Sequence, residues 1–134
     1  EVMAVYRKFY SFSYYLSEIF TTSETFQIDL TNTAPLQTYT NISDITLIDY
    51  TYYTPEELTF NGSLSTGIYS VNIDANPVTL TASGGSVGPF RYIIVSAQSA
   101  GDLCCYYDYG YSITLTNGQS LTLDFSASKL FTVA

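Results

Sequence analysis

One stretch of the chain, from Phe90 to Phe125, constrains the fold more than the rest of the sequence. It opens with Phe90–Val95, a run that is apolar at nearly every position and rich in β-branched and aromatic residues. Such a run is typical of a strand whose two faces are both covered by other parts of the protein. The sequence therefore predicts a central strand of a β-sheet at this position.

The end of the same stretch alternates between apolar and polar residues, which is typical of half-buried strands. Its apolar positions are Ile113, Leu115, Leu121, Leu123 and Phe125. We expect a β-hairpin with a three-residue loop, Thr116–Gly118, in which Gly118 is left-handed and Ile113 lies opposite Leu121. A two-residue turn at Asn117-Gly118 would instead place the apolar face of one arm against the polar face of the other.

Shorter alternating segments predict further strands at 26–31, 44–50, 69–73, 78–82 and 129–133. Asn76-Pro77 separates two of these segments and predicts a second hairpin between them. The pattern weakens from Thr51 to Thr66, where Pro and Asn-Gly signals indicate a long surface loop. Tyr50, Tyr52 and Tyr53 introduce this segment.

The N-terminal segment shows helical spacing. Its apolar residues recur at intervals of three and four, at Val5, Phe9, Phe12, Leu16 and Ile19. This spacing predicts an α-helix from about Ala4 to Phe20 with one apolar stripe. We expect the helix to cover the sheet. The alternative is that it projects and binds a partner, because Tyr6, Tyr10, Tyr14 and Tyr15 add aromatic side chains around it.

These elements predict a mainly β fold, an antiparallel β-sandwich or jelly-roll-like domain of about eight strands with one N-terminal α-helix packed on it. Residues 1–134 are expected to form a single domain, with strands from about residue 25 to 133. The expected core is Phe9, Phe12, Leu16, Phe26, Ile28, Leu30, Val71, Ile73, Leu80, Tyr92, Ile94, Ile113, Leu121, Leu123 and Phe125.

The charge of the chain makes a nucleic-acid partner unexpected. There are 12 acidic and 4 basic residues, giving a net charge of −8, whereas a nucleic-acid surface needs clustered Lys and Arg. The first twenty residues contain charges and have no sustained apolar core, so we expect neither a signal peptide nor a membrane-spanning segment.

The sequence predicts no enzyme. Histidine is absent, which excludes histidine-based triads and metal sites, and we expect no metal and no cofactor. Cys104 and Cys105 are neighbours and would point to opposite faces of a strand, so a disulfide between them would be strained. We expect two free thiols buried as small apolar residues, and the alternative is an interchain disulfide.

Five segments of the chain form a recognisable pattern. They are Phe90–Val95, Leu103–Gly110 and Ser112–Phe125, and nearer the N-terminus Met3–Phe9 and Leu30–Pro35. Together they resemble a family of small structural proteins from the virions of tailed bacteriophages. The resemblance touches both ends and most of the chain, whereas residues 50–65 match poorly. The chain also departs from the family pattern at Cys105, where a glycine is expected.

The resemblance implies a structural virion protein that decorates or cements the head, in contact with the major capsid protein or other virion subunits. We expect it to form a homo-oligomer or to be present in lattice-repeated copies. The acidic charge favours the outer surface of the particle, away from packaged DNA. The alternative is a tail- or fibre-associated module that binds a receptor or carbohydrate. The 14 tyrosines suit either strand propensity or interfaces, and the predicted contact residues are Tyr10, Tyr14, Tyr52 and Tyr53.

Overall fold

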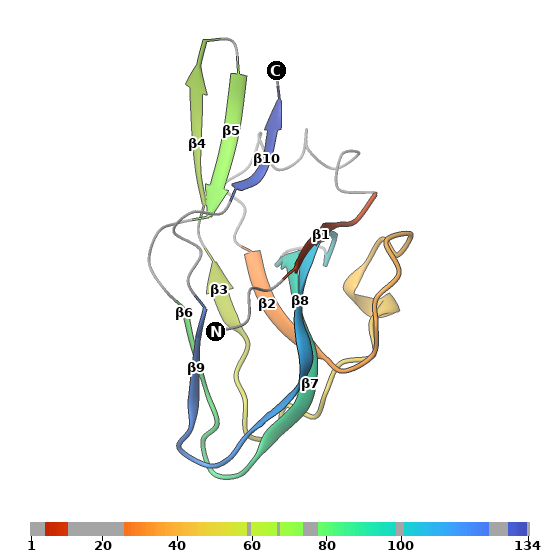
Figure 1. Ribbon diagram of the computed structural model, residues 1–134, viewed down its shortest axis with the longest axis vertical. Helices are drawn as coiled ribbons and strands as arrows, with labels where there is room; N and C mark the ends of the chain where they lie inside the picture. Colours follow the sequence, from red (N-terminus) through yellow and green to blue (C-terminus); the bar gives the residue numbers. More distant parts are fainter. Residues whose placement is uncertain are drawn as a thin grey trace.

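The computed structural model describes residues 5–10, 26–58, 60–66, 68–73, 78–98, 101–123 and 129–133. Their elements are β1 (Val5–Lys8), β2 (Phe26–Thr31), the 3-10 helix η1 (Ile42–Asp44), β3 (Glu56–Leu58), β4 (Phe60–Ser65), β5 (Ile68–Ile73), β6 (Val78–Thr81), β7 (Val87–Ala97), β8 (Leu103–Leu115), β9 (Ser120–Leu123) and β10 (Lys129–Val133) (Figure 1). All paired strands are antiparallel. The prediction of a mainly β chain with antiparallel sheets is confirmed.

The main sheet has five strands in the order β1-β8-β7-β2-β3. Strand β7 lies in its middle, as the apolar run predicts. Along β7, Ile93 and Val95 point to one face of the sheet and Ile94 points to the other, and all three are buried. Both faces of this sheet must therefore be covered.

The first core lies between this sheet and the two-stranded sheet β6-β9. It joins Phe26, Ile28, Leu30, Phe90, Ile93 and Val95 of the main sheet to Leu80, Ala82 and Leu123. The small sheet thus lies over one face of the large one. Figure 1 shows β6 and β9 running beside β7 and β8 on this side.

The second core lies on the opposite face and is formed by Phe9, Ile45, Ile94 and Leu103. Its cover comes from the segment around η1. Asn41 caps this short helix by accepting the N–H of Ser43, and backbone hydrogen bonds from Ile42 to Gly101 and from Leu103 to Thr40 fix it to the sheet.

A third sheet has the order β10-β5-β4. It contains the predicted closing strand at 129–133, which is observed as β10. In Figure 1 this sheet extends from the end of the molecule opposite the connections that join β6 to β7 and β8 to β9.

The predicted N-terminal helix is wrong over its first part. Val5–Lys8 forms β1, which pairs with β8 so that Arg7 lies opposite Tyr106 and Lys8 opposite Cys105. Residues 11–20 of the predicted helix, Tyr14 among them, lie outside the described residues. Phe9 is nevertheless buried, because it packs into the second core from the end of a strand.

Both predicted hairpins are wrong. Strand β9 pairs with β6, with Leu121 opposite Leu80, whereas Ile113 of β8 lies opposite Phe90 of β7. Gly118 is left-handed as expected, with φ of 86°, but its turn carries the chain from one sheet to the other. Strand β5 likewise pairs with β4 and β10 and not with β6.

The predicted strand at 44–50 is also wrong, since this segment contains the end of η1 and then an extended loop along the edge of β2. The N–H of Ile48 donates to the carbonyl of Leu30. The region from 51 to 66 is more regular than predicted, because β3 and β4 lie within it.

Most of the expected core residues whose side chains are described are buried. Phe9, Phe26, Ile28, Leu30, Leu80, Ile94 and Leu123 are buried, and Tyr92, Ile113 and Leu121 are partly buried against the two cores. The side chains of Phe12, Leu16, Val71, Ile73 and Phe125 lie outside the described part.

Cys104 and Cys105 are both buried in the first core and form no disulfide within the described part of the chain, so their predicted burial is confirmed. Burial raises the pKa of the Cys105 thiol far above its usual range, which leaves almost no thiolate to react. We expect a thiol-specific reagent to modify neither residue in the native protein and both after denaturation with guanidinium. Rapid labelling of either thiol under native conditions would contradict this packing.

Candidate functional site

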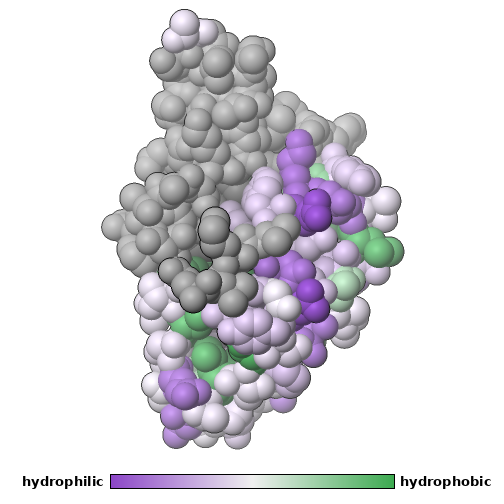
Figure 2. Space-filling view, in the orientation of Figure 1, coloured by the Kyte–Doolittle hydropathy of each residue, from purple (hydrophilic) through white to green (hydrophobic). Residues whose placement is uncertain are grey.

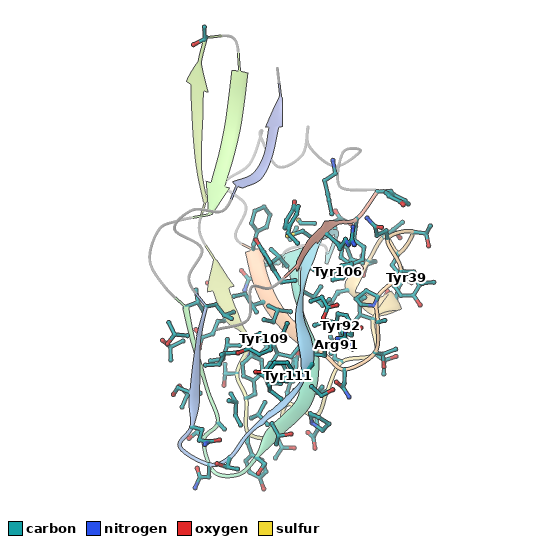
Figure 3. The ribbon with its side chains drawn as sticks, viewed as in Figure 1. Tyr39, Arg91, Tyr92, Tyr106, Tyr109 and Tyr111 are labelled. Carbon is teal, nitrogen blue, oxygen red and sulfur yellow. The ribbon has the colours of Figure 1, made fainter. Side chains whose placement is uncertain are left out.

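Aromatic side chains gather on the second-core side of β7 and β8. Tyr39, Tyr92 and Tyr106 are partly buried against the second core. The Tyr106 ring lies 5.3 Å from that of Phe9 and 6.1 Å from that of Tyr92, measured between centroids. Figure 3 shows Tyr39, Tyr92 and Tyr106 grouped on the side of β8 where η1 lies.

Two strongly exposed residues extend this surface. Tyr10 is 65% exposed and Leu36 is 55% exposed. They belong to neighbouring segments, because the N–H of Tyr10 donates to the carbonyl of Gln37 at 3.0 Å. We call Tyr10, Leu36, Tyr39, Tyr92 and Tyr106 together the tyrosine face.

Two of the four basic residues of this acidic chain lie at the tyrosine face. Arg7 lies opposite Tyr106 across the β1-β8 pair, and opposed residues share a side of the sheet. The guanidinium of Arg91 lies 5.3 Å from the ring centroid of Tyr92, within the range of a cation–π contact. Burial raises the pKa of Tyr106, and the positive charge of Arg7 partly offsets this effect.

Arg91 also lies opposite a wide bulge in β8. The register pairs Tyr92 with Asp108 and Phe90 with Ile113, so Arg91 alone on β7 opposes residues 109–112 on β8. The side chain of Asp108 stabilises this bulge. Its carboxylate accepts two hydrogen bonds from Arg91, at 2.8 and 3.0 Å, and a third from the N–H of Gly110 at 2.9 Å.

The bulge presents an aromatic pair. The rings of Tyr109 and Tyr111 meet edge to face with centroids 5.2 Å apart, and Tyr111 is 50% exposed. Gly110 has φ of 101°, a left-handed conformation that favours glycine. In Figure 3 the two tyrosines lie nearer β9 than the tyrosine face does. Bulges of this kind redirect side chains away from the regular pleat.

The four predicted contact tyrosines are not brought together. Tyr10 is exposed on the tyrosine face, and Tyr14 lies outside the described residues. Tyr52 is 41% exposed at the far end of the molecule, beside Gly84 and Gly85. Tyr53 is only 5% exposed and its hydroxyl donates to the carbonyl of Ile28 at 3.2 Å. Tyr53 is therefore a core residue and is no longer a candidate contact.

The sequence prediction missed Tyr39, Tyr92, Tyr106 and Tyr111 as surface residues. Tyr92 was expected in the core, and it is half-buried because it lies at the edge of the second core. A signal for Tyr106 was present, because it alternates with the buried Cys105 and Tyr107 and therefore points to the opposite face.

The acidic side chains of the main sheet take part in its packing. Among the described residues, no three His, Cys, Asp or Glu side chains lie close enough together to hold a metal ion. The two carboxylates nearest the middle of the main sheet already have structural partners. Asp108 is paired with Arg91, and the buried Asp29 accepts hydrogen bonds from Tyr50 and Gln27.

No family model, curated protein or solved structure matches this chain. Within the described ranges, no helix is long and apolar enough to cross a membrane. A functional proposal therefore depends on the chemistry of the surfaces described above.

Asp108 should stabilise the bulge in a pH-dependent way. The Arg91 hydrogen bonds lower the pKa of Asp108, so its contribution is fully present above the unfolded-state pKa of about 3.9 and is lost as the pH falls through the lower folded-state value. We expect Asp108→Asn to lower the free energy of unfolding near neutral pH, measured by urea denaturation, and to differ less from wild type as the pH falls below 3.9.

The matched control is Glu57→Gln, which changes an exposed carboxylate on β3 that accepts a hydrogen bond from Gln98. This substitution should have a smaller effect than Asp108→Asn, because exposed polar pairs contribute little to stability. Equal effects of the two substitutions at neutral pH would show that the Arg91 pair does not hold the bulge.

Proposed function

We propose that this chain is a structural virion protein of a tailed bacteriophage, which decorates or cements the outside of the capsid through its tyrosine face. The observation that carries the proposal is the exposure of Tyr10 and Leu36, which lie on hydrogen-bonded neighbouring segments, together with the half-buried rings packed against the second core. The sequence resemblance to small phage virion proteins supports the same function.

The composition of the tyrosine face fits a protein partner. Protein interfaces are enriched in Tyr and Arg relative to the rest of the surface, and are depleted of Lys, Glu and Asp at their centre. The tyrosine face combines four tyrosines and a leucine with Arg7 and Arg91 at its margin. The partner would be the major capsid protein or another virion subunit, and the copies would follow the symmetry of the shell.

The architecture proposed with this function is an antiparallel β-sandwich. Its support is the first core, where Leu80 and Leu123 of the small sheet pack with Ile28 and Ile93 of the large one. The excess of acidic residues supports a position outside the shell, where no binding to packaged DNA is required.

The competing proposal is a tail- or fibre-associated module, and copy number separates the two. A decoration protein is present in as many copies as the shell lattice repeats, whereas a fibre tip is present in a few copies per particle. The test is gel densitometry of purified virions, with the major capsid band as the reference. A stoichiometry of only a few copies per particle would overturn the decoration proposal.

Truncating Tyr10 should weaken attachment without unfolding the protein. We expect Tyr10→Ala to cost on the order of 1 to 3 kcal/mol of association with particles that lack the protein, measured as bound fraction after sedimentation. Attachment of the wild type should persist at high salt, because screening weakens exposed charge pairs far more than buried aromatic contacts.

Two other tyrosines serve as controls for this experiment. Tyr111→Ala removes a similarly exposed ring outside the tyrosine face and should leave attachment unchanged. Tyr53→Ala removes a buried ring and should lower the free energy of unfolding by about 3 to 5 kcal/mol, as for other large core side chains. If Tyr10→Ala destabilises the fold as much as Tyr53→Ala does, or if moderate salt releases the wild-type protein, the tyrosine face is not the attachment surface.

A further inference from the structure

Three connections meet at the end of the molecule remote from β10. They are the turn Thr51-Tyr52, the connection Ser83–Ser86 between β6 and β7, and the turn Thr116–Gln119 between β8 and β9. We call these residues the tip. In Figure 1 the two strand connections form the lower end of the molecule.

Hydrogen bonds fix the three connections to one another. The N–H of Ser83 donates to the carbonyl of Tyr52 at 3.2 Å, and the N–H of Gly84 donates to the side-chain oxygen of Asn117 at 2.9 Å. The N–H of Gly118 donates to the carbonyl of Ala82 at 2.8 Å. The tip is therefore a preorganised surface, which loses little conformational entropy on binding a ligand.

The Tyr52 ring lies flat on two glycines. A Cβ atom on Gly85 would overlap three ring carbons of Tyr52, and one on Gly84 would lie 3.2 Å from a fourth. Ring atoms on both sides of the Tyr52 axis therefore lie close to this backbone, and the ring occupies the space that a side chain at Gly85 would need. Tyr52 packs against the glycines and is still 41% exposed, so part of its surface is open to a ligand.

The surroundings of this ring carry hydroxyl and amide groups but little charge. Residues 75–90 and 109–123 contain no Asp, Glu, Lys or Arg, although the chain as a whole carries a net charge of −8. Asp49, which is engaged by Thr51, is the charged residue closest to Tyr52 in sequence. In Figure 2 the lower end of the molecule combines pale atoms with green and purple patches.

The hydroxyl surface continues onto the outer face of the small sheet. Thr79 lies opposite Thr122 and Thr81 lies opposite Ser120 across the β6-β9 pair, and all four are exposed. The hydroxyl oxygens of Thr81 and Ser120 are 2.9 Å apart. Each hydroxyl both donates and accepts hydrogen bonds.

From this arrangement we propose that the tip binds a neutral glycan, with a sugar ring stacked on the outer face of Tyr52. A sugar offers a C–H face to the aromatic ring and hydroxyls that match the Ser, Thr, Asn and Gln side chains around it. An acidic polysaccharide would need Lys or Arg, which the tip lacks. The mixture of Tyr, Ser, Gly and Asn also matches the residues that dominate adaptable recognition loops.

This inference goes beyond virion attachment and uses none of the residues of the tyrosine face. Its test uses the full chain and a panel of neutral oligosaccharides, maltohexaose, cellohexaose and mannohexaose, with an alginate hexamer as the acidic member. We expect at least one neutral sugar to bind with a dissociation constant of about 1 mM or tighter by calorimetry, and alginate to bind more weakly than that sugar.

Variants of Tyr52 separate stacking from folding. Tyr52→Ala should weaken binding about tenfold, the factor that corresponds to ~1.4 kcal/mol, whereas Tyr52→Phe keeps the ring and should retain most of the affinity. Tyr10→Ala should bind the sugar as the wild type does. In ¹⁵N-labelled wild-type protein, the sugar should shift the amide resonances of Gly84, Gly85 and Gly118 and leave that of Gly101 unchanged, which tests the site without any substitution.

Several outcomes would overturn the proposal. They are no binding of any neutral sugar in the panel at ten times the expected dissociation constant, tighter binding of alginate than of the neutral sugars, and resonance shifts that map away from the tip. Release of Tyr52→Ala from virions in the absence of any sugar binding would instead make the tip a protein interface.

Discussion

The structure depends on covering both faces of β7. Ile93 and Val95 face one side of the main sheet and Ile94 faces the other, so a single layer of structure cannot remove all three side chains from water. The two sides are covered by different means. On one side the small sheet brings Leu80 and Leu123, and on the other the segment around η1 brings Ile45. Hydrogen bonds between the η1 segment and the start of β8 hold this second cover in place.

A tyrosine hydroxyl also forms hydrogen bonds with polar groups at the edge of β2. Strand β3 pairs with β2 only as far as Ile28, so the N–H and carbonyl of Leu30 need other partners. The hydroxyl of Tyr50 accepts the Leu30 N–H at 3.0 Å and donates to the carboxylate of Asp29 at 2.7 Å. Asp29 is only 1% exposed, and desolvation raises its pKa despite this hydrogen bond.

The two tyrosines of this edge explain part of the unusual tyrosine content. The Tyr50 and Tyr53 rings meet edge to face with centroids 5.1 Å apart, and their hydroxyls reach polar groups of β2 that a phenylalanine would leave unpaired. Of the two explanations of the tyrosine content, strand and core packing accounts for these residues, whereas Tyr10 is exposed, as the proposed interface requires. Residue counts alone could not divide the tyrosines between these roles.

The residue patterns predicted well which side chains share a face of a strand, but they predicted poorly which strands pair with one another. The apolar run at 90–95 identified the central strand, and the left-handed Gly118 was foreseen from its turn signal. The hairpin it was assigned to is wrong because alternation determines which side chains share a face but not which strand lies alongside. The apolar side chain of Ile113 in β8 can lie opposite Phe90, as it does in the structure, as well as opposite Leu121, as the hairpin required.

The N-terminal helix failed for a related reason. The spacing of Val5 and Phe9 fits one turn of a helix, but four residues are also a whole number of strand periods, so both positions lie on one face of either structure. Tyr6 makes a contact that the helix prediction did not consider. Its ring packs edge to face on that of Tyr107 with centroids 5.5 Å apart, a long-range contact that favours pairing of β1 with β8.

Neighbouring tyrosines show the same limit at the level of single residues. Tyr52 and Tyr53 were indistinguishable in sequence, yet one lies on the glycines of the tip and the other donates a hydrogen bond to β2. What separates them is Gly84-Gly85, thirty residues away, because a side chain at Gly85 would leave no room for the Tyr52 ring. The decisive partner of a surface residue can thus be a glycine whose role becomes visible only in the fold.

The distribution of charge differs between the tyrosine face and the tip. Arg7 and Arg91 lie at the tyrosine face, whereas the tip and the small sheet use hydroxyl and amide groups to remain hydrated. A surface without charged residues is unusual for a soluble domain, since charge is the ordinary means of keeping a surface free of association. The lack of charged side chains at the tip is understandable if the ligand there is itself uncharged. A charged side chain without a partner in the ligand would have to be desolvated when such a ligand bound. The two surfaces share no residue, so attachment through the tyrosine face would leave the Tyr52 ring free to bind.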